Sequence, residues 1–293
     1  MDFSDIEKSK FFKNEKNLKK NSNHQTIIKT KKKNSKSINS SNFECDNTVN
    51  VDNIQINNIK STFSKWSPSN WKKHLNNIKE MRRNYTAPVD RMGCQKCADE
   101  SESGPVFRFQ TLIALMLSSQ TRDQITHNAM QRLKECRCTP EYIISISDEE
   151  LGKLIFPVSF WKRKVQYLKK TSKIVLEKYN GDIPTNIHEL SNLPGVGPKM
   201  AHICMNIAWN KISGIGVDTH VHRISNRLKW VPKPTKSPEE TRLALESWLP
   251  KELWRDINYL FVGFGQEICR SQQPRCLQCL NKSICCYNNQ YQF

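Results

Sequence analysis

Apolar residues recur at helical spacing through most of the chain beyond residue 65. In the first such run, positions i, i+3, i+4, i+7 and i+8 are apolar, the pattern of one helix face packed on a core. The residues of this run are Phe109, Leu112, Ile113, Met116 and Leu117. A last periodic run consists of Leu253, Trp254, Ile257, Leu260, Phe261 and Phe264. Strand-like alternation does not recur, so we predict an all-α fold.

Two of the predicted helices begin with sequence signals for a first turn. Ser147 is followed three residues later by Glu150, the spacing at which each side chain can accept a hydrogen bond from the other's backbone N–H. Ser237 and Glu240 repeat this spacing, with Pro238 at the first helical position, where no N–H is needed. Both signals predict helices that start at these serines.

Residues 1–65 differ in composition, with many Lys, Asn and Ser, few aromatic residues and no sustained period. Such a segment buries too little apolar surface to offset its ordering entropy, so we expect a disordered basic tail. Its stretch Lys29–Lys33 is a candidate nuclear-import signal, although short lysine runs are common in such tails. We therefore expect a nuclear protein, and the same tail leaves mitochondria open as a second destination.

The chain carries an excess of positive charge. A formal net charge of +18 favours a polyanionic partner, because each phosphate neutralised by Lys or Arg releases condensed counterions. Nucleic acid is the first candidate, and an acidic membrane surface is the competitor. No apolar run of about 18 residues and no secretory signal occur, so we expect a soluble intracellular protein. Eleven cysteines in such a protein indicate reduced thiols or metal ligands.

The most informative short stretch is Leu193–Lys199, LPGVGPK, between two helical patterns. The first pattern covers residues 185–193. The apolar positions of the second are Met200, Ile203, Cys204, Ile207 and Ala208. Gly195 and Gly197 allow a tight turn whose N–H groups face a ligand, and Pro198 starts a helix whose positive end points the same way. We predict a helix-hairpin-helix that binds DNA backbone without reading sequence, with a plain helix connection as the alternative.

Two residues near this turn are candidates for catalysis. Lys199 lies in the first turn of the second helix, where the dipole disfavours the charged amine, and a neutral amine is a nucleophile. A phosphate contact or a solvated position is the alternative for Lys199. Asp218, in Val217–Arg223 (VDTHVHR), has the position of an N-cap. A carboxylate held in this way is also placed to accept a proton or to stabilise positive charge on a sugar.

Three motifs together resemble the endonuclease III family of DNA glycosylases. They are LSSQTRD (Leu117–Asp123), LPGVGPK (Leu193–Lys199) and VDTHVHR (Val217–Arg223). The resemblance, which is strongest to the eukaryotic members, implies a helix-hairpin-helix glycosylase fold of two helical lobes with DNA in the cleft between them. The domains that it implies beyond the tail are an N-terminal part of the iron–sulfur domain at 66–105, a six-helix barrel domain at 106–212 and an iron–sulfur cluster domain at 213–293.

The same resemblance implies a bifunctional base-excision repair enzyme that removes oxidised pyrimidines and then cuts the strand by β-elimination. By position, Lys199 matches the family nucleophile, which forms a Schiff base, and Asp218 matches the catalytic carboxylate. Gln120 matches the residue that fills the gap left by the flipped base. The implied DNA contacts are Gln120, Leu193, Pro194, Gly195, Val196, Gly197 and His220. The implied partner is damaged double-stranded DNA, bound by a monomer, and the sequence identifies no protein partner.

Four cysteines near the end of the chain have the spacing C-x6-C-x2-C-x5-C. They are Cys269, Cys276, Cys279 and Cys285. Four thiolates can hold a [4Fe–4S] cluster or a tetrahedral zinc ion, and zinc sites more often have two close C-x2-C pairs. The family resemblance implies the [4Fe–4S] cluster, with Cys286 as a neighbour that shifts the last spacing by one residue. The basic residues in or beside these loops, which would face phosphates, are Arg270, Arg275 and Lys282.

Two further features are not explained by the family pattern. Phe156–Trp161 has Ser159 where relatives usually have Gly. Its aromatic pair is either a wedge that enters the DNA stack opposite the lesion or part of the core, and both interpretations stay open. The remaining close cysteine pairs are Cys94 with Cys97 and Cys136 with Cys138. We expect ordinary thiols there rather than a second metal site.

Two other functions fit part of the pattern. Adenine glycosylases share the hairpin and the cluster, but they lack a lysine at the position of Lys199 and carry a further C-terminal domain, whereas this chain stops eight residues after Cys285. A non-catalytic DNA-binding scaffold would use only the hairpin and the basic tail. The enzyme and the scaffold both predict a DNA affinity that falls with salt. Only the enzyme predicts that Asp218→Asn abolishes turnover and spares binding.

Overall fold

A computed structural model describes residues 66–287, and within this range it contains helices and turns but no β-strand. Its α-helices are α1 (Trp71–Met81), α2 (Pro88–Met92), α3 (Gly104–Ser118), α4 (Asp123–Glu135), α5 (Pro140–Ser145), α6 (Asp148–Ile155), α7 (Trp161–Tyr179), α8 (Ile187–Ser191), α9 (Pro198–Ala208), α10 (Thr219–Arg227), α11 (Pro238–Glu246) and α12 (Trp254–Glu267). Its 3-10 helices are η1 (Cys94–Lys96), η2 (Lys251–Leu253) and η3 (Cys276–Gln278).

The predicted all-α fold is confirmed. None of the helices between residues 66 and 287 is long and apolar enough to cross a membrane. The expected tail, residues 1–65, and its candidate import signal Lys29–Lys33 lie outside the described residues.

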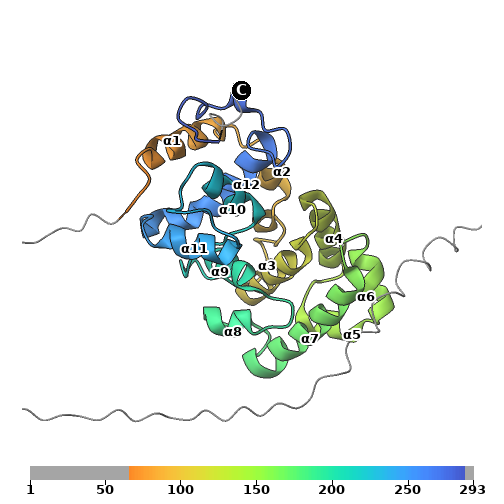
Figure 1. The fold of residues 1–293 in the computed structure, drawn as a ribbon. Helices are drawn as coiled ribbons and strands as arrows, with labels where there is room; N and C mark the ends of the chain where they lie inside the picture. The colour runs from red at the N-terminus through yellow and green to blue at the C-terminus, as the bar shows by residue number, and fades with distance from the viewer. Residues whose placement is uncertain (1–65, 288–293) are drawn as a thin grey trace, which may run out of the picture. The chain divides into compact units, whose positions relative to one another are not determined.

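The middle of the chain, α3 to α9, forms one helical lobe, which we call the barrel lobe (Figure 1). Helix α3 is at its centre, because the whole of Phe109–Leu117 is buried. The predicted stripe of five apolar positions therefore underestimates its burial, since Gln110 and Thr111 are enclosed as well. Gln110 accepts a hydrogen bond from the Asp99 N–H at 2.8 Å, and Thr111 donates to the Phe107 carbonyl at 2.9 Å. Satisfied polar atoms allow these side chains to lie inside.

The second lobe, called the cysteine lobe, brings α1 together with α10, α11 and α12 around a core of its own (Figure 1). Trp230 is completely buried there, and its ring centroid lies 5.5 Å from that of Trp248. Helix α1 also holds the segment after α12. The fully buried Asn281 donates to the His74 carbonyl at 3.3 Å and accepts from the Asn77 amide at 2.8 Å. The two ends of the described chain thus meet in one lobe, and the predicted pair of helical lobes is confirmed.

The predicted helix starts are confirmed, with one difference in their hydrogen bonds. At α6 the Ser147 hydroxyl accepts from the Glu150 N–H at 3.1 Å, and the Glu150 carboxylate accepts from the Ser147 N–H at 2.9 Å. At α11 the Ser237 hydroxyl accepts from the Glu240 N–H at 3.2 Å, but the Glu240 carboxylate accepts from the Lys236 N–H at 2.8 Å. The second pair is therefore not reciprocal, because the N–H before the cap faces the glutamate.

Candidate active site

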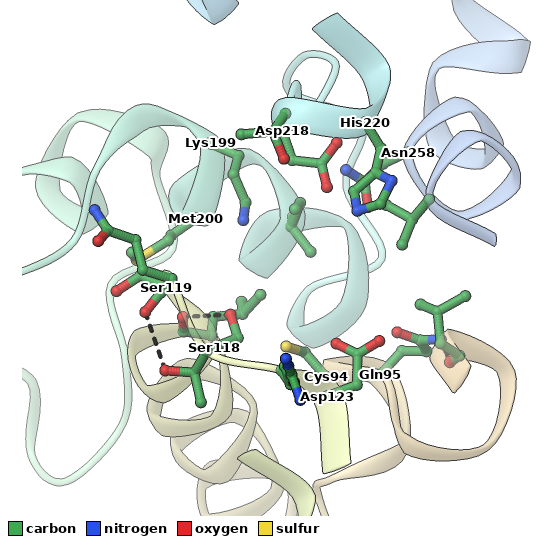
Figure 2. Close-up of a pocket in the computed structure, with 18 of the residues that line it drawn as sticks. Cys94, Gln95, Ser118, Ser119, Asp123, Lys199, Met200, Asp218, His220 and Asn258 are labelled. Carbon is green, nitrogen blue, oxygen red and sulfur yellow. Dashed lines mark hydrogen bonds between the residues drawn. The ribbon is translucent and has the colours of Figure 1, made fainter. Parts of the chain in front are cut away.

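An open cleft of about 850 Å³ lies between the two lobes. Its walls come from α2, η1, the turn after α3, the first turns of α9 and α10, and α12. The predicted site residues that line it are Gln120, Gly197, Lys199, Asp218 and His220. Figure 2 shows Lys199 and Asp218 pointing into the cavity from one side, with Cys94 and Asp123 on the opposite wall. Residues from three separate motifs thus meet in one cavity.

The hairpin lies where α8 meets α9. Helix α8 lies inside the predicted range 185–193. It begins at Ile187 because the Asn186 side chain caps it by accepting from the Glu189 N–H at 2.9 Å. The Val196 N–H closes the turn by donating to the Leu193 carbonyl at 3.0 Å. The Leu193 and Val196 side chains are buried in the barrel-lobe core. The side chains of these two predicted DNA-contact residues are therefore enclosed, and their N–H groups donate within the protein, since the Leu193 N–H donates to the Leu190 carbonyl at 3.2 Å.

The two hairpin glycines have different structural reasons. Gly195 has a φ of +82°, and a Cβ there would lie 2.7 Å from the Tyr167 ring, so both conformation and packing require glycine. Gly197 has a φ of −103°, and a Cβ there would meet no atom within 4 Å. Open space therefore lies beside the N-terminus of α9, where a phosphate can approach the backbone.

The two candidate catalytic residues are held by neighbouring helix starts. Lys199 is half-buried in the first turn of α9. Asp218 is the N-cap of α10, where its Oδ1 accepts from the Val221 N–H at 2.8 Å, as predicted. Gly216 brings the preceding segment onto α9, since a Cβ there would lie 2.3 Å from Ile203 and 3.6 Å from the Lys199 carbonyl oxygen. The N-cap bond fixes the Asp218 carboxylate at the edge of the cleft that contains Lys199.

The cleft also contains Asp123, which the sequence analysis did not assign to the site, and His220, a predicted DNA contact. Burial raises the pKa of the Asp123 carboxyl, and the negative charge of Asp218 raises it further. The Gln266 amide donates to this carboxyl at 2.8 Å and opposes the rise. Burial lowers the pKa of His220, whereas the charges of Asp218 and Asp123 oppose that shift. Asn258 lines the cleft too, and its amide donates to the Gly216 carbonyl at 2.6 Å. Asp123 ends the motif LSSQTRD, so its position in that motif was the available signal.

Two exposed turns meet at a pocket next to the cleft, and one of them, the Gln120 turn, also lines the cleft. Gln120 follows α3 with a φ of +53°, and Phe160 precedes α7 with a φ of +57°. Both residues line a pocket of about 220 Å³. Phe160 is 66% exposed, whereas Trp161 packs against the barrel-lobe core. Of the aromatic pair, Phe160 therefore fits the wedge interpretation and Trp161 the core interpretation. The Ser159 N–H joins the two turns by donating to the Thr121 hydroxyl at 3.2 Å.

The four predicted cluster ligands line one small cavity after α12. They are Cys269, Cys276, Cys279 and Cys285. Cys286 lines a different pocket, beside Trp66. Arg227 lies beside the first ligand, with its Nη1 3.4 Å from the Cys269 Sγ. Within residues 66–287, no group of three or more His, Cys, Asp or Glu side chains is arranged to hold a single metal ion. Four thiols around one cavity, next to a guanidinium that favours thiolates, fit a cluster ligated by four cysteines.

The other two close cysteine pairs are buried or half-buried. Burial raises the pKa of Cys97 and of Cys138 to about 12. The Cys97 Sγ lies 4.0 Å from the His127 Nδ1. Cys94 lines the cleft, and burial raises the pKa of its thiol as well. Burial also raises the pKa of Cys269, Cys276 and Cys279, so this shift does not distinguish these cysteines from the predicted cluster ligands.

Comparison with known proteins gives consistent matches. The family of HhH-GPD superfamily base excision DNA repair proteins matches residues 113–251. The chain is 58% identical over 221 residues to endonuclease III-like protein 1 of Gallus gallus, covering 75% of this chain and 79% of the relative. It is 48% identical over 223 residues to the endonuclease III homolog of Schizosaccharomyces pombe, covering 74% and 62%.

Solved structures match the fold as well. A trapped covalent endonuclease III–DNA intermediate, an estranged-adenine complex, has a TM-score of 0.65 and 28% identity, and the match covers 75% of this chain and 96% of that one. A non-covalent endonuclease III–DNA complex matches equally well in TM-score and identity. The helix-hairpin-helix glycosylase fold that the sequence predicted is thereby confirmed. This chain belongs to the endonuclease III family of base-excision DNA repair proteins.

Proposed function

We propose that this protein is a bifunctional DNA glycosylase and AP lyase that removes oxidised pyrimidines from damaged duplex DNA, with Lys199 as nucleophile and Asp218 as its carboxylate partner. The observation that carries the proposal is that both side chains point into one cleft, each held at a helix start (Figure 2). A damaged nucleotide reaches such a cleft by leaving the duplex, at a cost of a few kcal/mol that a lesion reduces.

The first chemical step replaces the base by the enzyme. The Lys199 amine attacks C1′, the C1′–N bond breaks, and the base leaves with the bonding electrons and takes up a proton. Asp218 accepts the proton that the amine loses, and its charge stabilises the positive charge developing on the sugar. The Val221 N–H that donates to Asp218 fixes the orientation of this carboxylate.

The second step cuts the strand. The sugar ring opens to an imine between Lys199 and C1′, which acidifies the C2′ proton. Loss of that proton breaks the C3′–O bond and expels the 3′ phosphate. Water then hydrolyses the imine and returns the Lys199 amine.

Borohydride trapping tests this assignment, because borohydride reduces the imine to a stable amine. We expect wild-type protein to form a covalent complex with a duplex that contains an oxidised pyrimidine, and Lys199→Ala to form none. Lys211→Ala is the matched control, since Lys211 is exposed beyond the other end of α9 and should trap like wild type. Asp218→Asn should bind the duplex and lose excision. Wild-type protein that binds but never traps would contradict the lyase assignment.

We also propose that the cavity lined by Cys269, Cys276, Cys279 and Cys285 holds a [4Fe–4S] cluster with a structural role. The shared cavity and the guanidinium of Arg227 support this assignment. The cluster would tie down the loop that carries the exposed Arg275, whose charge would face phosphates.

Analysis of the purified protein for iron and acid-labile sulfide tests the cluster. Four of each per chain are expected for wild type and for Cys286→Ser, because Cys286 lines another pocket. Cys285→Ser should lose them. Retention of the full content by Cys285→Ser, together with its loss in Cys286→Ser, would move the fourth ligand to Cys286.

For the whole protein we propose a monomer that acts on DNA in the nucleus, with mitochondria as a second destination. The lysines of Lys29–Lys33 support nuclear import. A fluorescent fusion of the full chain should be nuclear, and alanines at these lysines should release it to the cytoplasm. Unchanged nuclear signal in that variant would remove the stretch from the proposal.

A further inference from the structure

Lys164 is a buried lysine that the chemistry above does not use. It is only 6% exposed, although the run Trp161–Lys164 (WKRK) has the composition of a solvated surface. Its ammonium donates to the Leu117 carbonyl at 2.7 Å, to the Ser119 carbonyl at 2.8 Å and to the Thr121 hydroxyl at 3.3 Å. A buried charge is costly unless hydrogen bonds meet it, and here three acceptors match the three ammonium protons.

These acceptors lie in the last turn of α3 and in the turn that follows it, which carries Gln120. The carbonyls at the end of α3 have no partner further along the helix, so an ammonium group satisfies them. Gln120 itself has a φ of +53°, which a residue with a side chain adopts only when its surroundings hold it there. Lys164 supplies part of that support from α7.

The same lysine is connected to the turn that carries Phe160. The Lys164 N–H donates to the Phe160 carbonyl at 3.0 Å, in the first turn of α7. The Thr121 hydroxyl, an acceptor for the ammonium, also accepts from the Ser159 N–H at 3.2 Å. Gln120, Phe160 and Lys164 line one pocket of about 220 Å³. The Lys164 side chain thus holds the Gln120 turn directly and is connected to the Phe160 turn through the Thr121 hydroxyl and the first turn of α7.

We propose that Lys164 is a positioning residue that holds the Gln120 turn and the Phe160 turn in one fixed arrangement, so that both side chains enter the duplex together when a nucleotide is extruded. The inference rests on the proposed function, because extrusion creates the gap that these side chains would fill. Lys164 touches none of the reacting atoms. Its effect should therefore appear only with substrates that have an opposite strand.

The hydrogen bonds of Lys164 also predict a dependence on pH. Burial lowers the pKa of Lys164 to about 8, and Cys94 of η1 opposes this shift. The other charged or titratable groups that line its pocket are Arg163 and Tyr167, both on α7. A neutral amine has two protons for three acceptors and loses the strength of charge-assisted bonds. The two turns should therefore be held less firmly above pH 8.

The stability of the folded protein changes in the opposite direction to the support of the two turns as the pH rises. A lysine whose folded pKa lies below its unfolded value binds its proton less tightly in the folded protein, so its contribution to stability rises with pH from about 8 to about 10.4. A loss of duplex cleavage in this range that depends on Lys164 is therefore not a loss of folded protein.

The test compares β-elimination at an abasic site in duplex DNA with the same reaction in single-stranded DNA, which has no opposite base and no gap to fill. Lys164→Met removes the donors and keeps an unbranched side chain. We expect it to slow duplex cleavage about tenfold or more, while single-strand cleavage changes less than about twofold. Lys164→Arg, which keeps the charge, should restore part of the duplex rate. The advantage of wild type over Lys164→Met on duplex DNA should shrink as the pH passes 8.

Two further variants complete the design. Lys169→Met is the matched control, because Lys169 also lies on α7 and donates to the carbonyls of Ile144 and Ile146, far along the chain from the two turns. It should leave the ratio of duplex to single-strand rates unchanged. Thr121→Val removes the shared hydroxyl and should lower that ratio even if Lys164→Met does not fold.

The possible results distinguish the positioning role of Lys164 from the lyase activity itself. Equal slowing on both substrates, or no slowing of either by Lys164→Met and Thr121→Val, overturns the positioning role. A wild-type protein that cleaves neither substrate refutes the proposed lyase activity instead. Selective slowing on the duplex, with the control unchanged, supports the role of Lys164.

Discussion

Asp123 holds its carboxylate inside the cleft, where burial and the charge of Asp218 raise its pKa. A carboxyl group whose folded pKa exceeds the unfolded value of about 3.9 binds its proton more tightly in the folded protein. Its contribution to stability is therefore lost as the pH rises through the interval between the two values. The wild-type protein thus carries an unfavourable charge at neutral pH.

Replacement of this carboxylate should stabilise the protein. Asp123→Asn removes the charge and keeps an acceptor for the Gln266 amide. We expect its free energy of unfolding to exceed that of wild type by about 1 kcal/mol at pH 7, and by much less at pH 4. Urea unfolding of the full chain at both pH values measures this difference. The control is Asp256→Asn, at an exposed position on α12, which should show no gain in the free energy of unfolding. If Asp123→Asn gained equally at both pH values, the charge of Asp123 would be excluded as the cause.

Single residues differ in how well the sequence predicts their positions. Lys199 and Asp218 were predicted because each belongs to a short motif that itself builds a helix start. The burial of Lys164 depends on the end of α3, because its ammonium donates to Ser119, 45 residues away in sequence. Its neighbours in sequence, Lys162 and Arg163, instead predict a charged surface. Asp123 is an intermediate case, since its motif was visible but its desolvation comes from the other lobe. Burial of a charge is a tertiary property, and no local pattern encodes it.

At the scale of elements, the two glycines of the hairpin, Gly195 and Gly197, are expected to respond differently to replacement by alanine. Gly195→Ala places a Cβ 2.7 Å from the Tyr167 ring at a φ of +82°, so we expect a loss of about 1–3 kcal/mol in the free energy of unfolding. Gly197→Ala meets no protein atom and has an ordinary φ, so its stability should stay close to wild type. Its methyl group would instead occupy the open space beside the N-terminus of α9. We therefore expect weaker DNA binding from a fully folded protein.

Thermal unfolding and DNA titration of both variants distinguish these outcomes. Because a phosphate contact carries no sequence information, Gly197→Ala should weaken binding to damaged and undamaged duplexes to a similar extent. Unchanged affinity in Gly197→Ala would mean that phosphates do not approach this part of the hairpin.

Helix boundaries follow the same division between local and tertiary causes. The start of α6 was predicted because Ser147 and Glu150 satisfy each other's N–H groups without help from other elements. The pattern of α3 predicted a helix with one buried face, but the other helices of its lobe enclose it on all sides. A window of sequence shows which face is apolar, whereas the number of neighbours depends on the rest of the fold.

At the scale of the whole molecule, positive charge is divided between two parts of the chain. Residues 1–65 contain 13 Lys and 7 acidic residues, a net charge of +6, and the remaining residues have a net charge of +12. The candidate catalytic and metal-binding residues all lie within residues 66–287. The catalytic chemistry and a large share of the electrostatic attraction to DNA are therefore expected from the same part, and the tail is expected to add attraction without taking part in the chemistry.

Deletion of residues 1–65 should change binding and spare catalysis. The logarithm of DNA affinity falls linearly with the logarithm of salt concentration, with a slope of about 0.9 for each phosphate neutralised. If each of the tail's 13 lysines neutralised one phosphate, deletion would reduce the slope by about 12, which sets an upper limit. We expect a smaller but measurable reduction, and an unchanged single-turnover rate at saturating protein. Replacement of the lysines in Lys29–Lys33 by Gln should give an intermediate slope. Equal slopes for all three proteins would assign the whole salt dependence to residues 66–293.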